Sequence, residues 1–314
     1  MPKTVLILGA NGRFGRNAQS AFSWANWNVA TFDRATESLP DAAWGADVIV
    51  NAWNPAYPNW AKVVPKLTRQ VIATARDTGA TVLLPGNVYP YGPDMPAQLS
   101  ETTPHAAPQG LGKIKAEMEA AYRDAGVRTI ILRAGDFIDT EASGNWFDKI
   151  ITAKLEKGIV TYPGDLDTPH AWAFLHDVAD AAVALAEQAD SLPRFAEVQF
   201  DGFTLTGREL HAALEQATGR ALKLQQMSWL PLTLARPFWP MAKYLQEMRY
   251  LWNTPHGLCG ERLRELAPEL QPTPLIEALA ASVPDQIDPD RMVPRTSLRK
   301  RRPFNLCTCN SKTA

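Results

Sequence analysis

The sequence predicts an α/β fold built on a doubly wound parallel sheet, with a small, mostly helical C-terminal lobe added to it. Two observations carry this prediction. Through the first 135 residues, short apolar runs alternate with stretches of helical periodicity, the order of parallel strands joined by helical crossovers. Beyond that point the alternation loosens. Residues 229–270 become dense in Trp, Pro, Leu and Met, a composition that breaks long helices into short ones.

The first apolar run, Val5–Leu8, leads directly into the glycine-rich turn Gly9–Gly15. Four consecutive apolar residues are typical of a strand buried on both faces, and a helix is expected at 16–24. This order places the positive end of a helix where a pyrophosphate can bind, so the predicted sheet is Rossmann-type. The predicted cofactor-binding residues of the turn are Gly9, Asn11, Gly12, Arg13, Phe14 and Gly15. The simpler alternative is a tight turn without a ligand.

Each glycine of the turn has its own expected task. Gly9 allows the sharp turn, Gly12 lets the backbone approach the phosphates, and Gly15 lets the helix pack closely on the strand.

The later strands and helices of the domain follow the same alternation. Strands are expected at 28–32, 46–50, 81–84 and 127–132, and helices at 61–78 and 112–125. Open α/β sheets bind ligands beyond the carboxyl ends of their strands. We therefore expect the cofactor also to contact residues that follow the third and fourth strands, namely Ala52, Trp53, Asn54, Pro85 and Gly86. Tyr57, Trp60 and Tyr89 follow the same strand ends and are expected to wall the pocket.

The choice between NAD and NADP depends on one carboxylate and two guanidinium groups. Asp33 lies 24 residues after Gly9, near the spacing at which a carboxylate accepts hydrogen bonds from the ribose of NAD. Arg13 and Arg34 are placed where a guanidinium can clamp the 2′-phosphate of NADP. Asp33 and Arg34 are therefore also predicted to bind cofactor. Both cofactors stay open, with NAD slightly favoured.

The predicted organisation has two parts and a tail. Residues 1–160 are expected to form mainly the dinucleotide-binding domain, and 161–287 mainly the substrate lobe, with some of that chain returning to the sheet. Residues 291–314 hold seven Lys or Arg and no acid, so 288–314 is expected to be a disordered basic tail. Within 161–287 the expected elements are helices at 177–188 and 208–218 and a strand at 197–200.

Taken together, these features resemble the extended and atypical short-chain dehydrogenase/reductase superfamily, which includes NAD-dependent epimerases and dehydratases. The resemblance covers about residues 3–280. It rests on the glycine turn, on Pro85–Gly92 after the fourth strand and on Phe174–Ala179 at the start of a late helix. It implies an NAD(P)-dependent oxidoreductase, epimerase or dehydratase that acts on a small polar substrate. It also implies a trimmed adenine pocket, because only thirteen residues separate Asp33 from Asp47.

The catalytic Tyr–Lys pair of that superfamily cannot be placed on this sequence. Its members use a Tyr followed four residues later by a Lys, which lowers the pKa of the phenol for proton exchange during hydride transfer. None of the seven tyrosines has a Lys at that spacing. Alignment of the helix at 112–125 puts Lys113 in the lysine position and Gln109 in the tyrosine position. A shift of two residues puts Lys115 there instead. Asn87 replaces the family's serine, and the predicted catalytic residues are Tyr91, Asn87 and Lys113.

Simpler explanations and a second function stay open. Lys113 and Lys115 each precede a glutamate by four residues, the spacing of an ordinary surface pair. The lost Tyr and Ser leave a non-catalytic NAD(P)-binding sensor or regulator as the alternative function. We expect a small-molecule substrate, no nucleic acid, no membrane partner and no metal site, since the histidines lack metal spacing. No apolar run could span a membrane, and three cysteines form no disulfide framework, so a cytoplasmic location is expected. A homodimer is left open.

Overall fold

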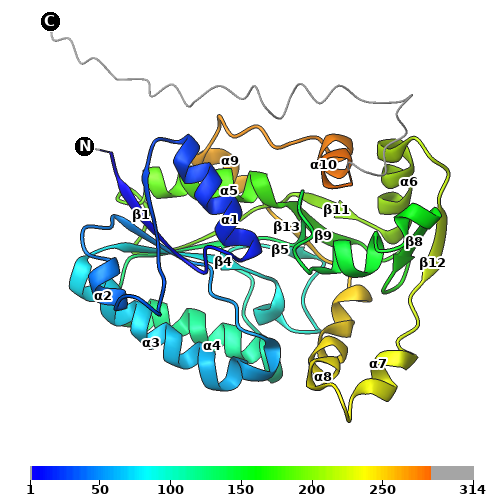
Figure 1. Ribbon diagram of the computed structural model, residues 1–314, viewed down its shortest axis with the longest axis horizontal. Coiled ribbons are helices and arrows are strands. Elements are labelled where there is room, and N and C mark those ends of the chain that lie inside the picture. Colours follow the sequence, from blue (N-terminus) through cyan, green and yellow to red (C-terminus); the bar gives the residue numbers. More distant parts are fainter. Residues whose placement is uncertain (1, 284–314) are drawn as a thin grey trace, which may run out of the picture.

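The structure, a computed structural model, describes residues 2–283, so the expected tail at 288–314 lies outside it. The main sheet has six parallel strands in the order β2-β1-β3-β4-β6-β10 (Figure 1). These strands are β1 (Thr4–Leu8), β2 (Asn28–Thr31), β3 (Val48–Asn51), β4 (Thr81–Gly86), β6 (Thr129–Arg133) and β10 (Phe195–Gln199). The predicted α/β class and doubly wound parallel sheet are confirmed.

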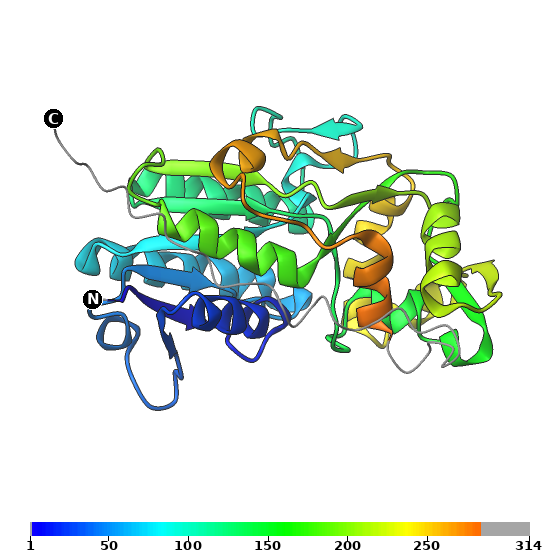
Figure 2. The ribbon, with the colours of Figure 1, turned by 90° about the horizontal axis from the view of Figure 1, so that it is seen from above.

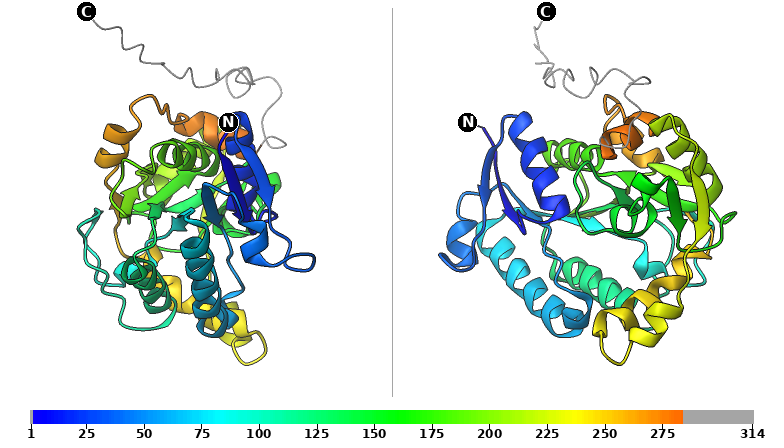
Figure 3. Two further views of the ribbon diagram at one scale, coloured as in Figure 1. Left: turned by 90° about the vertical axis from the view of Figure 1, so that its left-hand side faces the viewer. Right: turned by 45° about the vertical axis from the view of Figure 1, so that its right-hand side comes forward.

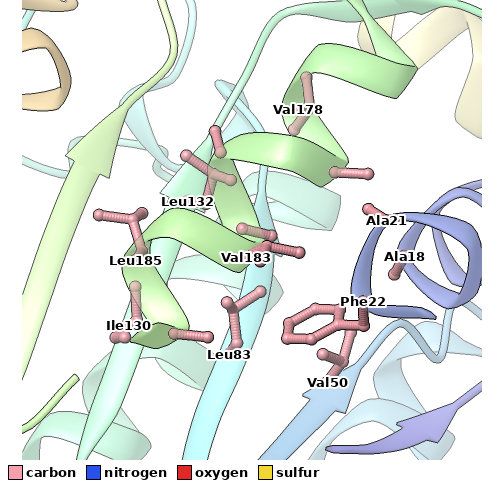
Figure 4. Packing of buried hydrophobic residues seen from close by; sticks show 14 of the residues in the cluster. Ala18, Ala21, Phe22, Val50, Leu83, Ile130, Leu132, Val178, Val183 and Leu185 are labelled. Atoms are coloured by element: carbon pink, nitrogen blue, oxygen red, sulfur yellow. The ribbon is translucent and has the colours of Figure 1, made fainter. Parts of the chain in front are cut away.

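Two pairs of helices cover the sheet, one pair on each face (Figures 1 and 2). The pairs are α1 (Arg13–Trp24) with α5 (Leu175–Glu187), and α3 (Trp60–Thr78) with α4 (Gly110–Ala125). In Figure 4, Phe22 of α1 lies beside the strand residues Val50 and Leu83, with Val183 of α5 in the same cluster. Burial on both faces explains why the central strands β1, β3, β4 and β6 are mostly apolar, whereas the edge strand β2 is not.

The order in which strands are added to the sheet reverses at β1. It runs from β1 to β2 on one side and then returns to β3 on the other side of β1. The register pairs Leu8 with Asn51, so Gly9 and Ala52 leave the sheet as neighbours. They lie at the topological switch point, where open α/β sheets bind ligands.

The segment between β2 and β3 is as short as the sequence indicates. It contains only α2 (Leu39–Ala42), whose N-terminus is capped by Ser38, and β2 forms the edge of the sheet. Helix α1 begins at Arg13, three residues before the predicted start. The reason is that Gly12, with an extended backbone, serves as its N-cap.

The remaining elements form a lobe around a second apolar core. Helices α6 (Gly207–Thr218) and α10 (Leu275–Ser282) pack against each other there. Short strands form three small sheets, namely β7 (Asp136–Ile138), β9 (His170–Phe174) and β11 (Phe203–Leu205); β8 (Ile159–Tyr162) and β12 (Lys223–Gln226); and β5 (Gln98–Leu99) and β13 (Gly257–Leu258). The boundary near residue 160 stays a prediction, although α5 and β10 do rejoin the main sheet.

The Trp- and Pro-rich region folds into short helices, as expected. They are α7 (Leu230–Ala235), α8 (Pro240–Glu247), η5 (Met248–Trp252) and α9 (Glu261–Leu266).

Candidate active site

Two glycines of the turn are required by its own packing. Gly9 has a φ of +77°, a left-handed conformation, and a Cβ there would lie 2.9 Å from the carbonyl oxygen of Ala52. Gly15 lies in the first turn of α1, and its Cβ would lie 2.2 Å from the carbonyl oxygen of Gly9. No side chain fits at either position without a shift of the backbone.

Gly12 has a different environment. It is exposed, its φ is −79°, and a Cβ there would meet only the carbonyl oxygen of Gly9, at 3.1 Å. It caps α1 without a side-chain hydrogen bond, and the first turn of the helix carries no acid. The first turn of α1 therefore presents its backbone donors and its positive dipole to an open side. These residues fit a pyrophosphate, whose approach a side chain at position 12 would obstruct.

Aromatic rings border the turn at the ends of β2 and β3. Trp53 reaches within 3.3 Å of the Cβ position of Gly9. Its ring packs edge-on against Phe32, with the ring centroids 5.7 Å apart. Asp33 and Arg34 follow Phe32 and are exposed. Phe32 was not among the predicted site residues, although it directly precedes the predicted ribose-binding carboxylate.

The other predicted cofactor residues range from exposed to buried. Asn11 and Asn54 are exposed, and Pro85 is half-buried. Phe14 is 4% exposed and belongs to the core between α1 and α5. A Cβ on the buried Gly86 would lie 2.8 Å from the Ile131 side chain. Packing alone therefore accounts for Phe14 and Gly86.

A cluster of polar side chains lies beside the turn, at the carboxyl ends of the strands. Tyr57 of η1 (Tyr57–Asn59) and Tyr89 of η2 (Tyr89–Tyr91) share a hydrogen bond, with 2.8 Å between their hydroxyl oxygens. Burial raises the pKa of both phenols, and the negative charge of Asp136, the first residue of β7, raises both further. The positive charge of Arg13 acts on Tyr57 in the opposite direction. Arg13, from the glycine turn, thus lies within electrostatic reach of Tyr57.

Asp136 is held by His170 of β9. Nε2 of His170 lies 2.9 Å from Oδ2 of Asp136, and Nδ1 lies 3.3 Å from the carbonyl oxygen of Leu251. Both ring nitrogens of His170 therefore face oxygen atoms. The ring stacks on Trp252, with centroids 4.2 Å apart. The side chain of Asp136 is 29% exposed and that of His170 only 2%, so the carboxylate is the accessible end of the pair.

Buried aromatic groups surround this pair. His256 lies edge-on to His170, with centroids 4.5 Å apart, and burial is the main cause that lowers its pKa to about 3. Within residues 2–283, the Tyr162 hydroxyl and the Trp172 indole N–H are buried without a hydrogen-bond partner. Such atoms are candidates for contact with a substrate or a bound water.

Tyr91, the predicted proton donor, belongs to a separate buried network. It is 1% exposed, and its hydroxyl donates to Glu197 at 3.0 Å and accepts from Gln199 at 2.9 Å. The wholly buried Arg133 donates to Glu197 at 2.7 Å and to Glu119 of α4 at 2.8 Å. The Tyr91 hydroxyl is therefore engaged on both sides inside this network, and its role as a proton donor stays a prediction.

The same network contains a group with metal-ligand spacing. His105, Glu119 and Glu197 each offer one ligand atom, and these atoms lie within 4.8 Å of one another. The guanidinium of Arg133 already bridges the two carboxylates and supplies the compensating positive charge. We therefore assign no metal to this group.

Asn87 and Lys113 have structural partners. Oδ1 of Asn87 accepts from the backbone N–H of Tyr89 at 3.1 Å, which supports η2. Lys113 lies 3.8 Å from Glu117, and more than half of each side chain is exposed. This is the surface pair that the sequence analysis left open.

Lys115 points the other way. Its Nζ lies 5.2 Å from the ring of Trp60, and burial lowers its pKa. Trp60 packs edge-on against Tyr57, with centroids 5.0 Å apart. Lys115 is therefore the lysine of α4 that approaches the polar cluster.

Asp136 and His170 were not among the predicted site residues. Asp136 follows β6 by only three residues, so the rule that ligands bind beyond strand ends could have identified it. His170 gives no local signal, because its partner lies 34 residues away in the chain.

No protein-family model and no curated protein sequence matches this chain. Solved structures share its fold. MoeE5 in complex with UDP-glucose and NAD is 15% identical over 90% of this chain and 97% of that one, with a TM-score of 0.69. A putative epimerase from Burkholderia cenocepacia J2315 is 19% identical over 91% and 98%, with a TM-score of 0.71.

A third structure is TunA, an NAD-dependent NDP-hexosamine 5,6-dehydratase. It is 14% identical over 92% of this chain and 100% of that one, with a TM-score of 0.71. The expected resemblance of fold to NAD-dependent epimerases and dehydratases is confirmed.

Proposed function

We propose that the protein binds NAD(H) or NADP(H) at the glycine turn. The observation that carries this proposal is the contrast between Gly12 and its two neighbouring glycines. Packing explains Gly9 and Gly15, whereas at Gly12 a Cβ would meet a single atom. A ligand that approaches the backbone closely explains the missing side chain there. Two of the neighbours in fold, MoeE5 and TunA, are NAD proteins, which supports the same cofactor class.

NAD is the favoured form. Of the two arginines that could bind a 2′-phosphate, Arg13 acts on Tyr57 and so lies toward the polar cluster. That leaves the exposed Arg34 beside the equally exposed Asp33. A carboxylate at this position accepts from ribose hydroxyls and repels a 2′-phosphate.

The proposed activity is that of an oxidoreductase, epimerase or dehydratase acting on a small polar substrate. The nicotinamide, when bound, supplies or accepts the hydride. Tyr57 exchanges a proton with the substrate oxygen, a role that we transfer to it from Tyr91. Burial raises its pKa, so the phenol is protonated and can donate a hydrogen bond to that oxygen, while the positive charge of Arg13 acts against the rise. Asp136, oriented by His170, offers an accessible acceptor for a substrate hydroxyl.

A non-catalytic NAD(P)-binding sensor is the second candidate. It is favoured by the lack of any Tyr followed four residues later by Lys. The two candidates share the cofactor site and differ only in turnover.

Calorimetric titration of the full chain with NAD⁺, NADH, NADP⁺ and NADPH tests the shared part. We expect the NAD pair to bind more tightly, and no binding of any of the four would refute both candidates. Turnover is then measured through nicotinamide absorbance with a panel of nucleotide sugars and small carbonyl compounds. Nucleotide sugars come first because MoeE5 was solved with UDP-glucose. Binding without turnover on the whole panel would favour the sensor.

A further inference from the structure

The hairpin of α7 and α8 exposes an apolar surface that the proposed function does not use. Leu230, Leu234, Phe238 and Trp239 are 62%, 66%, 89% and 47% exposed. They are four of the six large hydrophobic residues exposed among residues 2–283, and they fall within ten consecutive positions. Single exposed apolar residues are common, but clustered ones mark interaction surfaces. We call these four residues the apolar tip.

The hairpin is fixed at its base and across its two helices. Nε1 of Trp229 donates to the carbonyl oxygen of Pro163 at 2.7 Å, and Gln246 of α8 donates to Thr233 of α7 at 2.8 Å. Leu230 and Leu234 are one turn apart and share a face of α7. The connection between the helices projects from the molecule on the side of α3 and α4 (Figures 1 and 3). The apolar tip is therefore a supported projection.

Basic residues accompany the tip without any acid. Residues 216–246 include four Lys or Arg and no Asp or Glu, in a chain whose net charge is −1. Two of the four, Arg236 and Lys243, are exposed within or next to the tip. The apolar tip therefore carries an exposed positive charge, Arg236, between Leu234 and Phe238, and a second, Lys243, four residues after Trp239.

We propose that the apolar tip inserts into the interfacial region of an anionic lipid bilayer. Leu, Phe and Trp side chains with flanking Lys or Arg are the composition of segments that bind at a membrane surface. Trp prefers the headgroup level, and each basic residue near an anionic surface adds to the attraction. Among residues 2–283, no helix has the length and apolar content to cross a bilayer, but insertion of a tip needs no such helix. Such insertion departs from the expectation of no membrane partner.

A second copy of the chain fits this surface less well. A twofold contact through the tip would bring Arg236 and Lys243 of one copy toward the same residues of the other, and like charges repel. Four side chains also provide much less than the roughly 800 Å² per partner of a stable interface. A bilayer has no such area requirement and supplies the negative charge.

Co-sedimentation of the full chain with vesicles tests the proposal. The vesicles are phosphatidylcholine alone, or phosphatidylcholine mixed with phosphatidylglycerol. We expect binding to the anionic vesicles that weakens with added salt. The double variant Leu234→Ser/Phe238→Ser should bind about tenfold less or worse. Arg236→Glu/Lys243→Glu should lose the preference for phosphatidylglycerol.

Trp44→Ser is the matched control, because Trp44 is 82% exposed but lies in the turn after α2. It should bind vesicles like the wild type. All variants keep the seven basic residues of 291–314. If that segment were responsible for vesicle binding, the Leu234→Ser/Phe238→Ser variant would bind as well as the wild type, which would overturn the proposal. No vesicle binding by the wild type would also overturn it. So would a wild-type dimer, seen by light scattering, that becomes monomeric in the double variant. Thermal melting confirms that each variant is folded.

Discussion

Replacement of Gly12 by Ala separates binding of the cofactor from stability of the fold. The backbone of Gly12 has a φ of −79°, which any residue adopts. An added Cβ meets only the carbonyl oxygen of Gly9 at 3.1 Å, so that oxygen must give by a few tenths of an ångström. Ala at a compatible position also gains about 0.4–1 kcal/mol from the unfolded state. We expect the free energy of unfolding to change by less than about 1 kcal/mol.

Cofactor affinity should respond far more strongly. The methyl group would stand between the first turn of α1 and an approaching pyrophosphate. Loss of one charge-assisted hydrogen bond from a backbone N–H costs about 1.5–3 kcal/mol, or roughly 10–150-fold in Kd. Calorimetric titration of wild type and Gly12→Ala with NADH measures this ratio. Urea denaturation without cofactor measures the stability of the same two proteins.

Gly15→Ala is the contrasting variant. Its Cβ would lie 2.2 Å from the carbonyl oxygen of Gly9, so α1 must move away from the turn, at a cost of about 1–3 kcal/mol or more. We expect this variant to lose stability as well as affinity. Gly12→Ala that binds NADH with wild-type affinity would refute the assignment of the turn. Gly12→Ala that is as unstable as Gly15→Ala would show that packing explains all three glycines.

Three further outcomes are expected elsewhere in the molecule. Tyr57→Phe should lower kcat by roughly 10²–10⁴-fold without changing the Kd of NADH. Equal losses of kcat in Tyr57→Phe and Tyr91→Phe would contradict the assignment of proton exchange to Tyr57. Glu119→Gln should lower the free energy of unfolding, measured by urea denaturation, by about 3–5 kcal/mol, because it leaves buried Arg133 with one carboxylate. Its control, Glu117→Gln at an exposed position, should change that free energy by less than about 0.5 kcal/mol. Burial lowers the pKa of His256 to about 3 in the folded protein, below its value in the unfolded chain. The contribution of neutral His256 to stability is therefore complete above about pH 6.5. It is lost by about 1.4 kcal/mol per pH unit as the pH falls toward 3. His256→Gln should flatten urea-derived stability over that range, and a difference from wild type that does not vary with pH would contradict this.

The sheet and the glycine turn could be predicted because their signals are local. Val5–Leu8 and the glycines after it specify a strand, a turn and a helix within about twenty residues, and the structure forms all three. The short gap between Asp33 and Asp47 likewise leaves room only for the single-turn helix α2 between β2 and β3. In each case, the spacing along the chain alone fixes the outcome.

The polar cluster could not be predicted in the same way, because its members meet only through tertiary packing. Tyr57 and Tyr89 are 32 residues apart, and Arg133 reaches Glu197 across 64 residues. The sequence places Tyr91 after β4 but not the direction of its hydroxyl. That direction is set by Glu197 and Gln199, which both lie on β10 and hydrogen-bond to the Tyr91 hydroxyl.

The two lysines of α4 lie in different surroundings. Residues two apart on a helix point in directions about 200° apart, so Lys113 pairs with Glu117 on the surface while Lys115 faces Trp60. The same Trp60 ring packs against Tyr57, so Trp60 links Lys115 to the polar cluster. We expect Lys115→Met to raise the pH at which turnover depends on Tyr57, because a positive charge near a phenol lowers its pKa. Lys113→Met is the matched control and should leave the pH profile of kcat unchanged. Equal profiles for both variants would mean that Lys115 only packs against Trp60.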